Sequence, residues 1–291
     1  MSAHDDLARG LPVVLRRLLV DGEDPSTISR TELAAALELP PPPRPAANLR
    51  SLRMLRMLHG LPLELSVHTE ETPYVLRLPS ALDCGACAAL RAAVDAHLDS
   101  KGGSCGRPSA GTDEIRDHML AQSFASQLVL DRAGLEALIG PRDTASLWRL
   151  PAHVRARRDP SSRTRADKAT VQAAAAEADG NPNAPEFVGQ VEITVRRYAP
   201  GARPWVPFHH DRAACTVNVA LADDMRHSGG RLLAYISGNG VSIVERAEGE
   251  VTAHGPELMH AVTRLVEGSR YSLILFFGPR QGMRVHETSR K

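Results

Sequence analysis

The feature that most constrains the fold is a series of short apolar segments between residues 187 and 280. They are rich in β-branched and aromatic residues, and Gly, Asn or Pro separates one from the next. This texture is typical of the short strands of a double-sheet barrel. Seven segments fit the pattern, namely VEITVRRY, CTVNVAL, RLLAYI, VSIV, EVTA, AVTRLV and RYSLILFF. They predict a jelly-roll or similar double-sheet barrel.

The sequence before these segments is mainly helical in pattern. Apolar residues recur with helical spacing at 4–20, 31–38 and 82–98. The run LPPPPRP contains a Pro-rich segment at 40–45, which favours extended polyproline II. We therefore expect an α+β protein with helices packed outside the barrel. Residues 1–70 would form a helical N-terminal extension with a Pro-rich linker, and residues 71–291 would form the main domain.

Composition excludes several classes of protein and partner. Apolar residues make up 43% and charged residues 24% of the 291 residues, as in ordinary globular chains. The formal net charge of +1 predicts no nucleic-acid or membrane partner, and the sequence carries no signal for an oligomeric state. Without a signal-like leader or a long apolar span, we expect a cytoplasmic protein. Four scattered cysteines do not suggest a disulfide framework, and we interpret Cys84-Gly85-Ala86-Cys87 as structural.

A candidate metal site begins in the segment Pro207-Phe208-His209-His210-Asp211. Side chains two positions apart on a strand point to the same face, so His209 and Asp211 would point together and His210 would point away. An imidazole and a carboxylate at this spacing suit iron(II), provided that a second histidine completes a two-His, one-carboxylate triad. The sequence therefore predicts an iron site that needs one more ligand from elsewhere.

Two downstream histidines, His254 and His260, could supply that ligand. We choose His260, because it opens a strand-like run and is followed ten residues later by Arg270. Arg270 and Ser272 would share one strand face, and a guanidinium matches a carboxylate with two parallel hydrogen bonds. His254 and His210 are expected to have no role in the site.

These residues also occur in a known protein family. From Val188 to Pro279, about a third of the chain, the sequence resembles the catalytic domain of prolyl and lysyl hydroxylases, which are iron(II)- and 2-oxoglutarate-dependent dioxygenases. The segment PFHHDRAACTVNVAL is especially similar to the lysyl hydroxylase segment around the iron-binding His-x-Asp. The family's elements occur in order: Tyr198 in RRYAPG, His209-x-Asp211, TVNVAL, SGGRL at 228–232, the 254–260 segment and GSRY at 268–271.

The resemblance implies a double-stranded β-helix at about 187–280 and a defined set of ligands. Iron would be held by His209, Asp211 and His260, and the far carboxylate of 2-oxoglutarate by Arg270. Tyr198, Ser272 and Asn218 would assist in binding the co-substrate. The cofactors implied are iron(II), 2-oxoglutarate and O2, with ascorbate as an optional reductant. Because related halogenases lack the carboxylate ligand, the presence of Asp211 favours hydroxylation.

The expected reaction is hydroxylation of a prolyl or lysyl side chain of a protein, or of a small molecule, with release of succinate and CO2. Two alternatives stay open: a non-catalytic binding module on the same barrel, and a cupin-like metal barrel that does not use 2-oxoglutarate. Collagen is an unexpected substrate, because its hydroxylases act in the secretory pathway. The basic segment at 155–165 is interpreted as a loop that could close over the site.

Overall fold

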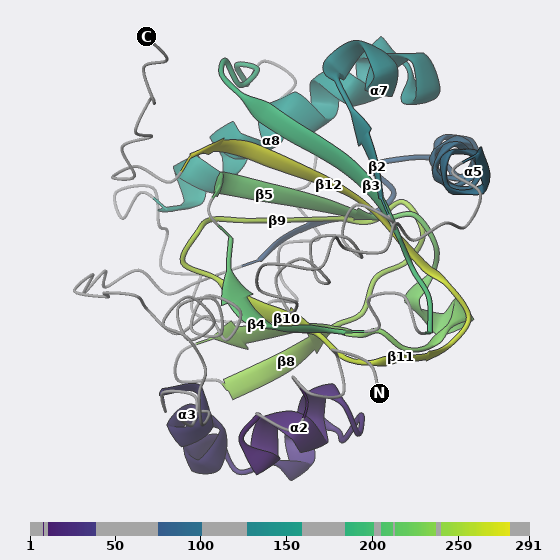
Figure 1. Cartoon of the computed structure of the whole chain (residues 1–291). Coiled ribbons are helices and arrows are strands. Elements are labelled where there is room, and N and C mark those ends of the chain that lie inside the picture. Colours follow the sequence, from purple (N-terminus) through teal and green to yellow (C-terminus); the bar gives the residue numbers. More distant parts are fainter. Residues whose placement is uncertain are drawn as a thin grey trace, which may run out of the picture.

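The computed structural model describes residues 8, 11–38, 75–100, 127–158, 184–200, 205–211, 213–236 and 240–279. Two antiparallel sheets lie at its centre, and helices cover both of them from outside (Figure 1). The predicted mixture of helices and antiparallel strands is confirmed. The Pro-rich linker at 40–45 lies outside the described residues, and the proposed division at residue 70 stays a prediction.

The larger sheet has six strands, and its two faces differ in chemistry. Residues that alternate along its central strands, such as Val195, Val217 and Leu275, are fully buried on the outer face. Residues between them, such as Arg196 and Asn218, face the second sheet and line a cavity. The strand order is β1 (Leu76–Leu78), β9 (Val251–His254), β5 (Ala213–Ala220), β12 (Arg270–Pro279), β3 (Val191–Tyr198) and β2 (Gln127–Leu130).

The smaller sheet has four strands, in the order β4 (Val206–His210), β10 (Met259–Val262), β7 (Leu232–Ile236) and β8 (Gly240–Val244). A separate two-stranded ribbon joins β6 (Ser228–Gly229) to β11 (Leu265–Glu267). From β3 onward the chain passes repeatedly from one main sheet to the other. Within the described residues the two sheets share no hydrogen-bonded strand pair, so the predicted closed barrel is not observed.

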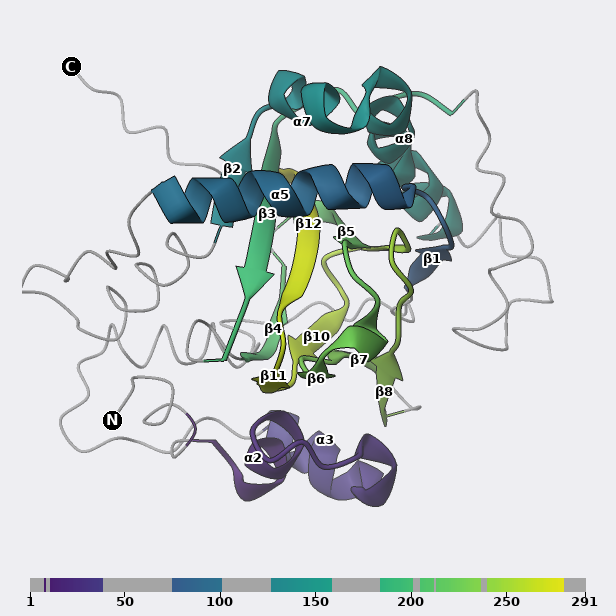
Figure 2. The same cartoon turned by 90° about the vertical axis from the view of Figure 1, so that its right-hand side faces the viewer.

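Three helices pack on the outer face of the larger sheet: α5 (Cys84–Ser100), α7 (Arg132–Ile139) and α8 (Pro141–Arg158). Figure 2 shows α5 crossing β3 and β12, with α7 and α8 beside it. Leu90 and Val94 of α5 are fully buried, and Trp148 of α8 meets Phe277 edge to face. The sequence predicted α5 but neither α7 nor α8. Because α8 continues to Arg158, the interpretation of 155–165 as a loop was wrong for its first four residues.

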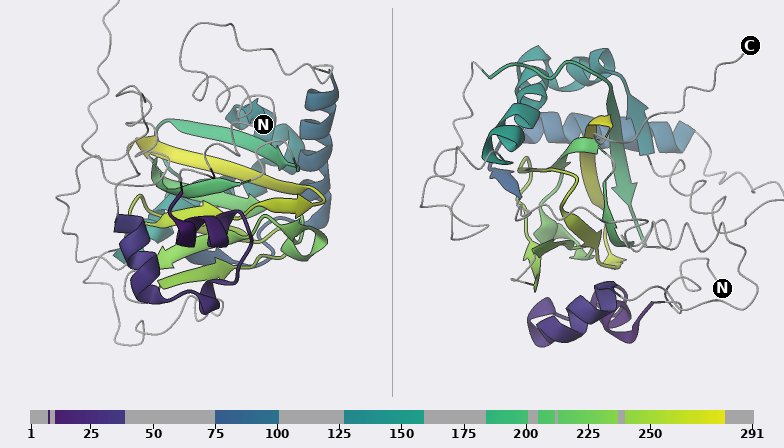
Figure 3. Two further views of the ribbon diagram at one scale, coloured as in Figure 1. Left: turned by 60° about the horizontal axis from the view of Figure 1, so that its bottom comes forward. Right: turned by 90° about the vertical axis from the view of Figure 1, so that its left-hand side faces the viewer.

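Two further helices, α2 (Val13–Leu19) and α3 (Arg30–Glu38), lie against the smaller sheet from the opposite side (Figures 1 and 3). The helix predicted at 4–20 is interrupted, since α2 begins only after Pro12, whose backbone is extended. Leu18 and Leu19 are fully buried in one apolar cluster with Phe208 and Leu233 of the sheet. Among the described residues, no helix is long and apolar enough to cross a membrane.

Candidate functional site

A cavity lies between the facing surfaces of the two main sheets. The smaller sheet lines it with aliphatic side chains, among them Leu232, Val244 and Val262, and with two histidines. The larger sheet contributes a polar wall that includes Arg270, Tyr198, Asn218, Thr216 and Thr252. Every residue predicted for the site except Ser272 lines this one cavity.

One end of the cavity holds the predicted metal ligands. His209 pairs with His260 across β4 and β10, and Asp211 follows β4 directly, so His260 meets two residues that lie about 50 positions before it in the sequence. The carboxylate of Asp211 has Oδ1 3.5 Å from Nε2 of His209 and Oδ2 3.6 Å from Nε2 of His260. One ligand atom from each residue lies within 4.8 Å of the others, which is compatible with a shared ion. His210 is not among the described residues that line the cavity, as the strand alternation predicts.

The hydrogen bonds of the two rings fix which nitrogen is available to a metal. Nδ1 of His209 lies 2.8 Å from the carbonyl oxygen of Pro207, and Nδ1 of His260 lies 3.4 Å from that of Leu258. A carbonyl only accepts, so each Nδ1 carries the proton and each Nε2 presents a lone pair toward Asp211. Lone pairs and a carboxylate repel one another unless a cation lies between them. The donor set therefore fits a divalent metal.

The protonation states also suit metal binding. Burial lowers the pKa of His260 well below its ordinary value, so this imidazole is neutral at pH 7. Burial opposes ionisation of Asp211, but positive charge on His260 and a hydrogen bond from His209, when these rings are protonated, hold the pKa of its carboxyl well below the usual range, and a bound cation would supply the same positive charge. Neutral imidazoles and an ionised carboxylate are the forms that coordinate a metal.

A third histidine, His254, lies at the same end of the cavity. It ends β9 and is 5% exposed, with Nε2 3.7 Å from Oδ2 of Asp211. Its Nδ1 is 2.9 Å from the carbonyl oxygen of Gly255, so its Nε2 lone pair also points inward. His254 was expected to have no role, whereas it lies beside the three predicted metal ligands. A strand register that opposes His254 to Thr216 of β5 was the missing information.

The predicted arginine, Arg270, occupies the other end of the cavity. It opens β12 opposite Tyr198 of β3, and its guanidinium carbon lies 4.8 Å from the centre of the tyrosine ring. Arg270 is 1% exposed, and none of its guanidinium nitrogens has a hydrogen-bonding partner within the described residues. A buried charge with unused donors is costly, so this end is built for an anion.

A glycine turn allows the arginine side chain to lie where it does. Gly229 and Gly230 have φ values of +71° and +65°, and a Cβ atom on Gly229 would lie 2.0 Å from the carbonyl oxygen of Arg264. A Cβ on Gly230 would come within 3.4 Å of Cδ of Arg270. These positive φ values, which glycine adopts without strain, form a tight turn that leaves room for the Arg270 side chain.

The three predicted helper residues differ in their surroundings. Tyr198 is buried beneath Arg270. Ser272 is fully buried, and its hydroxyl has no hydrogen-bonding partner within the described residues, yet it does not line the cavity. The amide oxygen of Asn218 accepts a hydrogen bond of 2.9 Å from Nη1 of Arg246.

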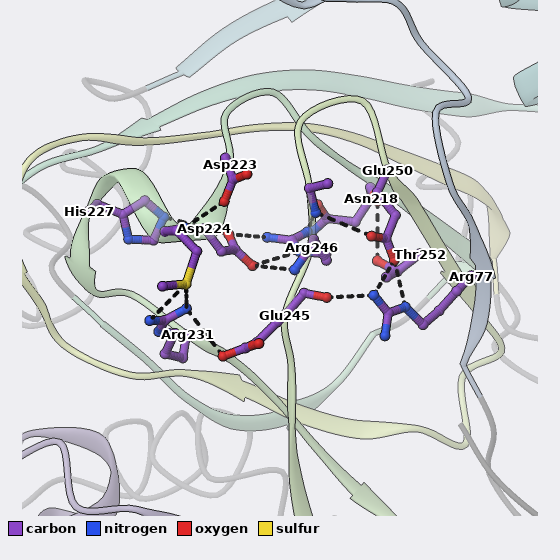
Figure 4. Close-up of polar contacts among 12 residues, drawn as sticks. Arg77, Asn218, Asp223, Asp224, His227, Arg231, Glu245, Arg246, Glu250 and Thr252 are labelled. Atoms are coloured by element: carbon purple, nitrogen blue, oxygen red, sulfur yellow. Dashed lines mark hydrogen bonds and ion pairs between the residues drawn. The ribbon is translucent and has the colours of Figure 1, made fainter. Parts of the chain in front are cut away.

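Arg246 belongs to a buried polar network that the sequence did not reveal. Figure 4 shows its guanidinium between Asp224 and Asn218. Arg246 and Asp224 are 2% and 1% exposed, and they come from segments 22 residues apart. Neither residue belongs to a recognisable local motif, so no sequence signal could have found the pair.

Comparison with known families and curated proteins gives no match. No model of a known protein family matches the chain. No curated protein matches its sequence.

Solved structures of oxygenases are similar to the chain at low identity. A prolyl-4-hydroxylase from Pseudomonas putida is 16% identical with a TM-score of 0.37, over 72% of this chain and 94% of that one. AviO1 from Streptomyces viridochromogenes is 17% identical with a TM-score of 0.42, over 72% and 91%. A viral collagen prolyl hydroxylase from Paramecium bursaria Chlorella virus-1 is 12% identical with a TM-score of 0.39, over 70% and 94%. Because all three similarities are low, the function has to come from the site itself.

Proposed function

We propose that this chain is an iron(II)- and 2-oxoglutarate-dependent dioxygenase. One observation carries the proposal: a single cavity holds a His-Asp-His group at one end and a buried arginine with unused donors at the other. The first end suits a chelated cation, and the second suits a carboxylate. A molecule with a keto-acid head and a carboxylate tail, such as 2-oxoglutarate, matches both. A cupin-like barrel that does not use 2-oxoglutarate gives no reason to bury Arg270.

We assign the roles as follows. His209, Asp211 and His260 hold iron(II), and Arg270 binds the far carboxylate of 2-oxoglutarate with two parallel hydrogen bonds. Tyr198, Ser272 and Asn218 assist at that end. The chemistry that iron(II) supplies in such a site is the oxidation of 2-oxoglutarate by O2 to succinate and CO2, coupled to hydroxylation of a C–H bond. The protein side chains orient the co-substrate and exclude water from it.

The strand arrangement supports a double-stranded β-helix as the catalytic core at about 187–280. The chain alternates between the two sheets, and strands distant in sequence, such as β5 and β12, are neighbours. Such alternation is the winding of a jelly roll. The N-terminal extension and main domain, divided near residue 70, complete the proposed organisation.

We propose a prolyl or lysyl side chain of a protein, or a small molecule, as the acceptor of the hydroxyl group. The aliphatic wall of the smaller sheet and Phe276 of β12 suit a substrate whose reacting carbon is apolar. A cytoplasmic location is proposed as well, and it agrees with the absence of a disulfide at Cys84 and Cys87 among the described residues.

The test uses metal-free protein under anaerobic conditions. Addition of iron(II) and then 2-oxoglutarate should produce the weak visible absorption band of an iron(II)–keto-acid chelate, and O2 should then yield succinate. Pyruvate is the matched control, because it has the keto-acid head without the second carboxylate. Pyruvate should therefore need a far higher concentration to give the band. If 2-oxoglutarate gives no band, the proposed function is wrong.

A further inference from the structure

The buried ion pair of Asp224 and Arg246 lies at the anion end of the cavity. Nε and Nη2 of Arg246 each lie 3.4 Å from the Asp224 carboxylate, one at Oδ2 and one at Oδ1. The backbone N–H of Arg246 also donates to Oδ2 at 3.1 Å, and the N–H of Asp224 donates to the carbonyl oxygen of Arg246. Backbone and side-chain bonds together fix the position of the pair (Figure 4).

Among Asp, Glu, Lys and Arg, four residues are buried in the part of the chain that the structure describes: Asp224, Arg246, Glu250 and Arg270. Glu250 pairs with Arg77 at 2.5 Å, and Asp224 pairs with Arg246. Only Arg270 of the four is left without a hydrogen-bonding partner there. The two buried arginines and Asp224 together carry a single positive charge.

The three charges lie close together: a Cβ on Gly230 would be 3.4 Å from both Cδ of Arg270 and Cε1 of His227, and Nε2 of His227 is 3.5 Å from Oδ1 of Asp224. Burial opposes ionisation of Asp224, but the charge of Arg246, the contact with His227 and the charge of Arg270, in that order, hold the pKa of its carboxyl far below the usual range. Burial also lowers the pKa of Arg246, and the like charge of Arg270 acts in the same direction, while Asp224 opposes it. The charges of both arginines therefore act on Asp224, yet among them only Arg246 donates hydrogen bonds to its carboxylate.

We infer that Asp224 and Arg246 are positioning residues for the co-substrate: Arg246 occupies the Asp224 carboxylate, so that Arg270 stays unpaired and free to bind one carboxylate. This inference rests on the proposed function. Without the Arg246 charge, Asp224 would be the buried carboxylate available to Arg270, and an internal ion pair would compete with the ligand. The pair thereby sets the charge of the site to suit a ligand whose tail carries a single carboxylate.

The simpler view is that the pair only ties the 3-10 helix at Asp224–Arg226 to the segment after β8. Both views expect loss of stability when either residue is changed. They differ for the double change. If the Asp224 charge competes for Arg270, removing both the Asp224 and the Arg246 charge should restore 2-oxoglutarate binding. If the pair is only structural, the second substitution should not restore it.

The experiment measures the dissociation constant of 2-oxoglutarate by anaerobic titration of iron(II)-loaded protein. The variants are Arg246→Gln, Asp224→Asn and the double variant, each checked for folding by circular dichroism. Asp223→Asn is the matched control, because Asp223 is the neighbouring carboxylate and accepts only from the N–H of Met225 within its own turn. The iron(II) dissociation constant, measured in parallel without 2-oxoglutarate, reports on the other end of the cavity.

We expect Arg246→Gln to raise the dissociation constant of 2-oxoglutarate at least about tenfold, which corresponds to the loss of one charge-assisted hydrogen bond. The double variant should return to within about threefold of wild type, and Asp224→Asn should bind at least as tightly as wild type. Iron(II) binding and the Asp223→Asn variant should be unchanged. A double variant as weak as Arg246→Gln would overturn the inference, as would an Arg246→Gln variant that binds like wild type.

A second variant covers the case in which Arg246→Gln does not fold. Arg246→Lys keeps the positive charge but loses the planar fork, so 2-oxoglutarate binding should stay within about threefold of wild type. A tenfold loss in a folded Arg246→Lys protein would overturn the inference. Absence of the chelate band in wild type itself would instead overturn the proposed function, and this inference with it.

Discussion

The two ends of the cavity present opposite chemistry to a ligand. At the metal end, the Nε2 lone pairs of His209, His254 and His260 face the carboxylate of Asp211, so every inward atom is an acceptor. At the anion end, the inward guanidinium of Arg270 offers only N–H donors. A cation is needed at the first end and an anion at the second. The contrast explains why one bound molecule, anchored through a metal at its head, can satisfy both ends.

The ends also differ in how they are held in place. The proposed metal ligands lie on the smaller sheet or, for Asp211, directly after its strand β4, and their neighbours Phe208 and Ala261 are buried in the cluster formed with α2 and α3. Arg270 sits on the larger sheet, whose outer face is covered by α5 and α8. Changes at one end should therefore leave the other largely intact.

The largest effect is expected from Asp211→Ala. Loss of an outer-shell partner alone costs about 10- to 100-fold in metal affinity, so loss of this carboxylate ligand should cost several hundred-fold or more and abolish succinate formation. Iron(II) affinity is measured by competition with a chelating dye. His210→Ala is the matched control, since His210 lies between His209 and Asp211 in the sequence but does not line the cavity. Near-normal iron binding by Asp211→Ala would contradict the metal assignment.

The second effect concerns the packing behind the metal end. Leu18 is fully buried between α2 and the smaller sheet, so Leu18→Ala should lower the free energy of unfolding by about 3 kcal/mol through lost burial and a cavity. Urea denaturation measures this value. Val13→Ala is the control on the same helix, because Val13 is 64% exposed and should change little. Equal effects of the two substitutions would mean that α2 does not pack on the sheet as described.

The third effect isolates the anion end. Arg270→Ala removes the bidentate partner of the far carboxylate, and we expect the dissociation constant of 2-oxoglutarate to rise about 50-fold. The iron(II) dissociation constant should change less than about threefold if the two ends are separate. The exposed Arg264 provides the control substitution Arg264→Ala. An unchanged 2-oxoglutarate dependence in Arg270→Ala would remove this residue from the co-substrate site.

The smallest effect is a pH dependence confined to the anion end. The pKa of Asp224 is depressed in the folded chain, whereas the unfolded carboxyl titrates near an ordinary value of about 4. Such a group contributes stability that is full above the unfolded pKa and is lost as the pH falls toward the folded pKa. The unfolding free energy of wild type should thus exceed that of Asp224→Asn by a constant amount from about pH 7 to about pH 5, and the gap should narrow below about pH 4.

Urea denaturation of both proteins across this pH range measures the gap. The difference between wild type and Asp223→Asn should stay small throughout. A gap that widens toward acid pH would show that Asp224 is not an ionised partner in the folded chain.

The sequence by itself determined the local parts of this protein. Strand alternation placed His209 and Asp211 on one face and His210 on the other, because side-chain direction along a strand has a period of two. It also located β3 at the residues where the strand was expected, and the core helix α5 nearly so. Selecting His260 required only its position at the start of a strand and its distance from Arg270. These features depend on neighbours in the chain.

Tertiary structure decided everything that depends on which distant strands face each other. The register of β9 against β5 directs His254 toward the metal end of the cavity. The segment after β8 brings Arg246 next to Asp224. That Arg270 has no hydrogen-bonding partner among the described residues is likewise a property of its surroundings, since its burial and its contacts are set by segments far away in sequence. Local periodicity fixes where a side chain points, but only packing fixes what it meets.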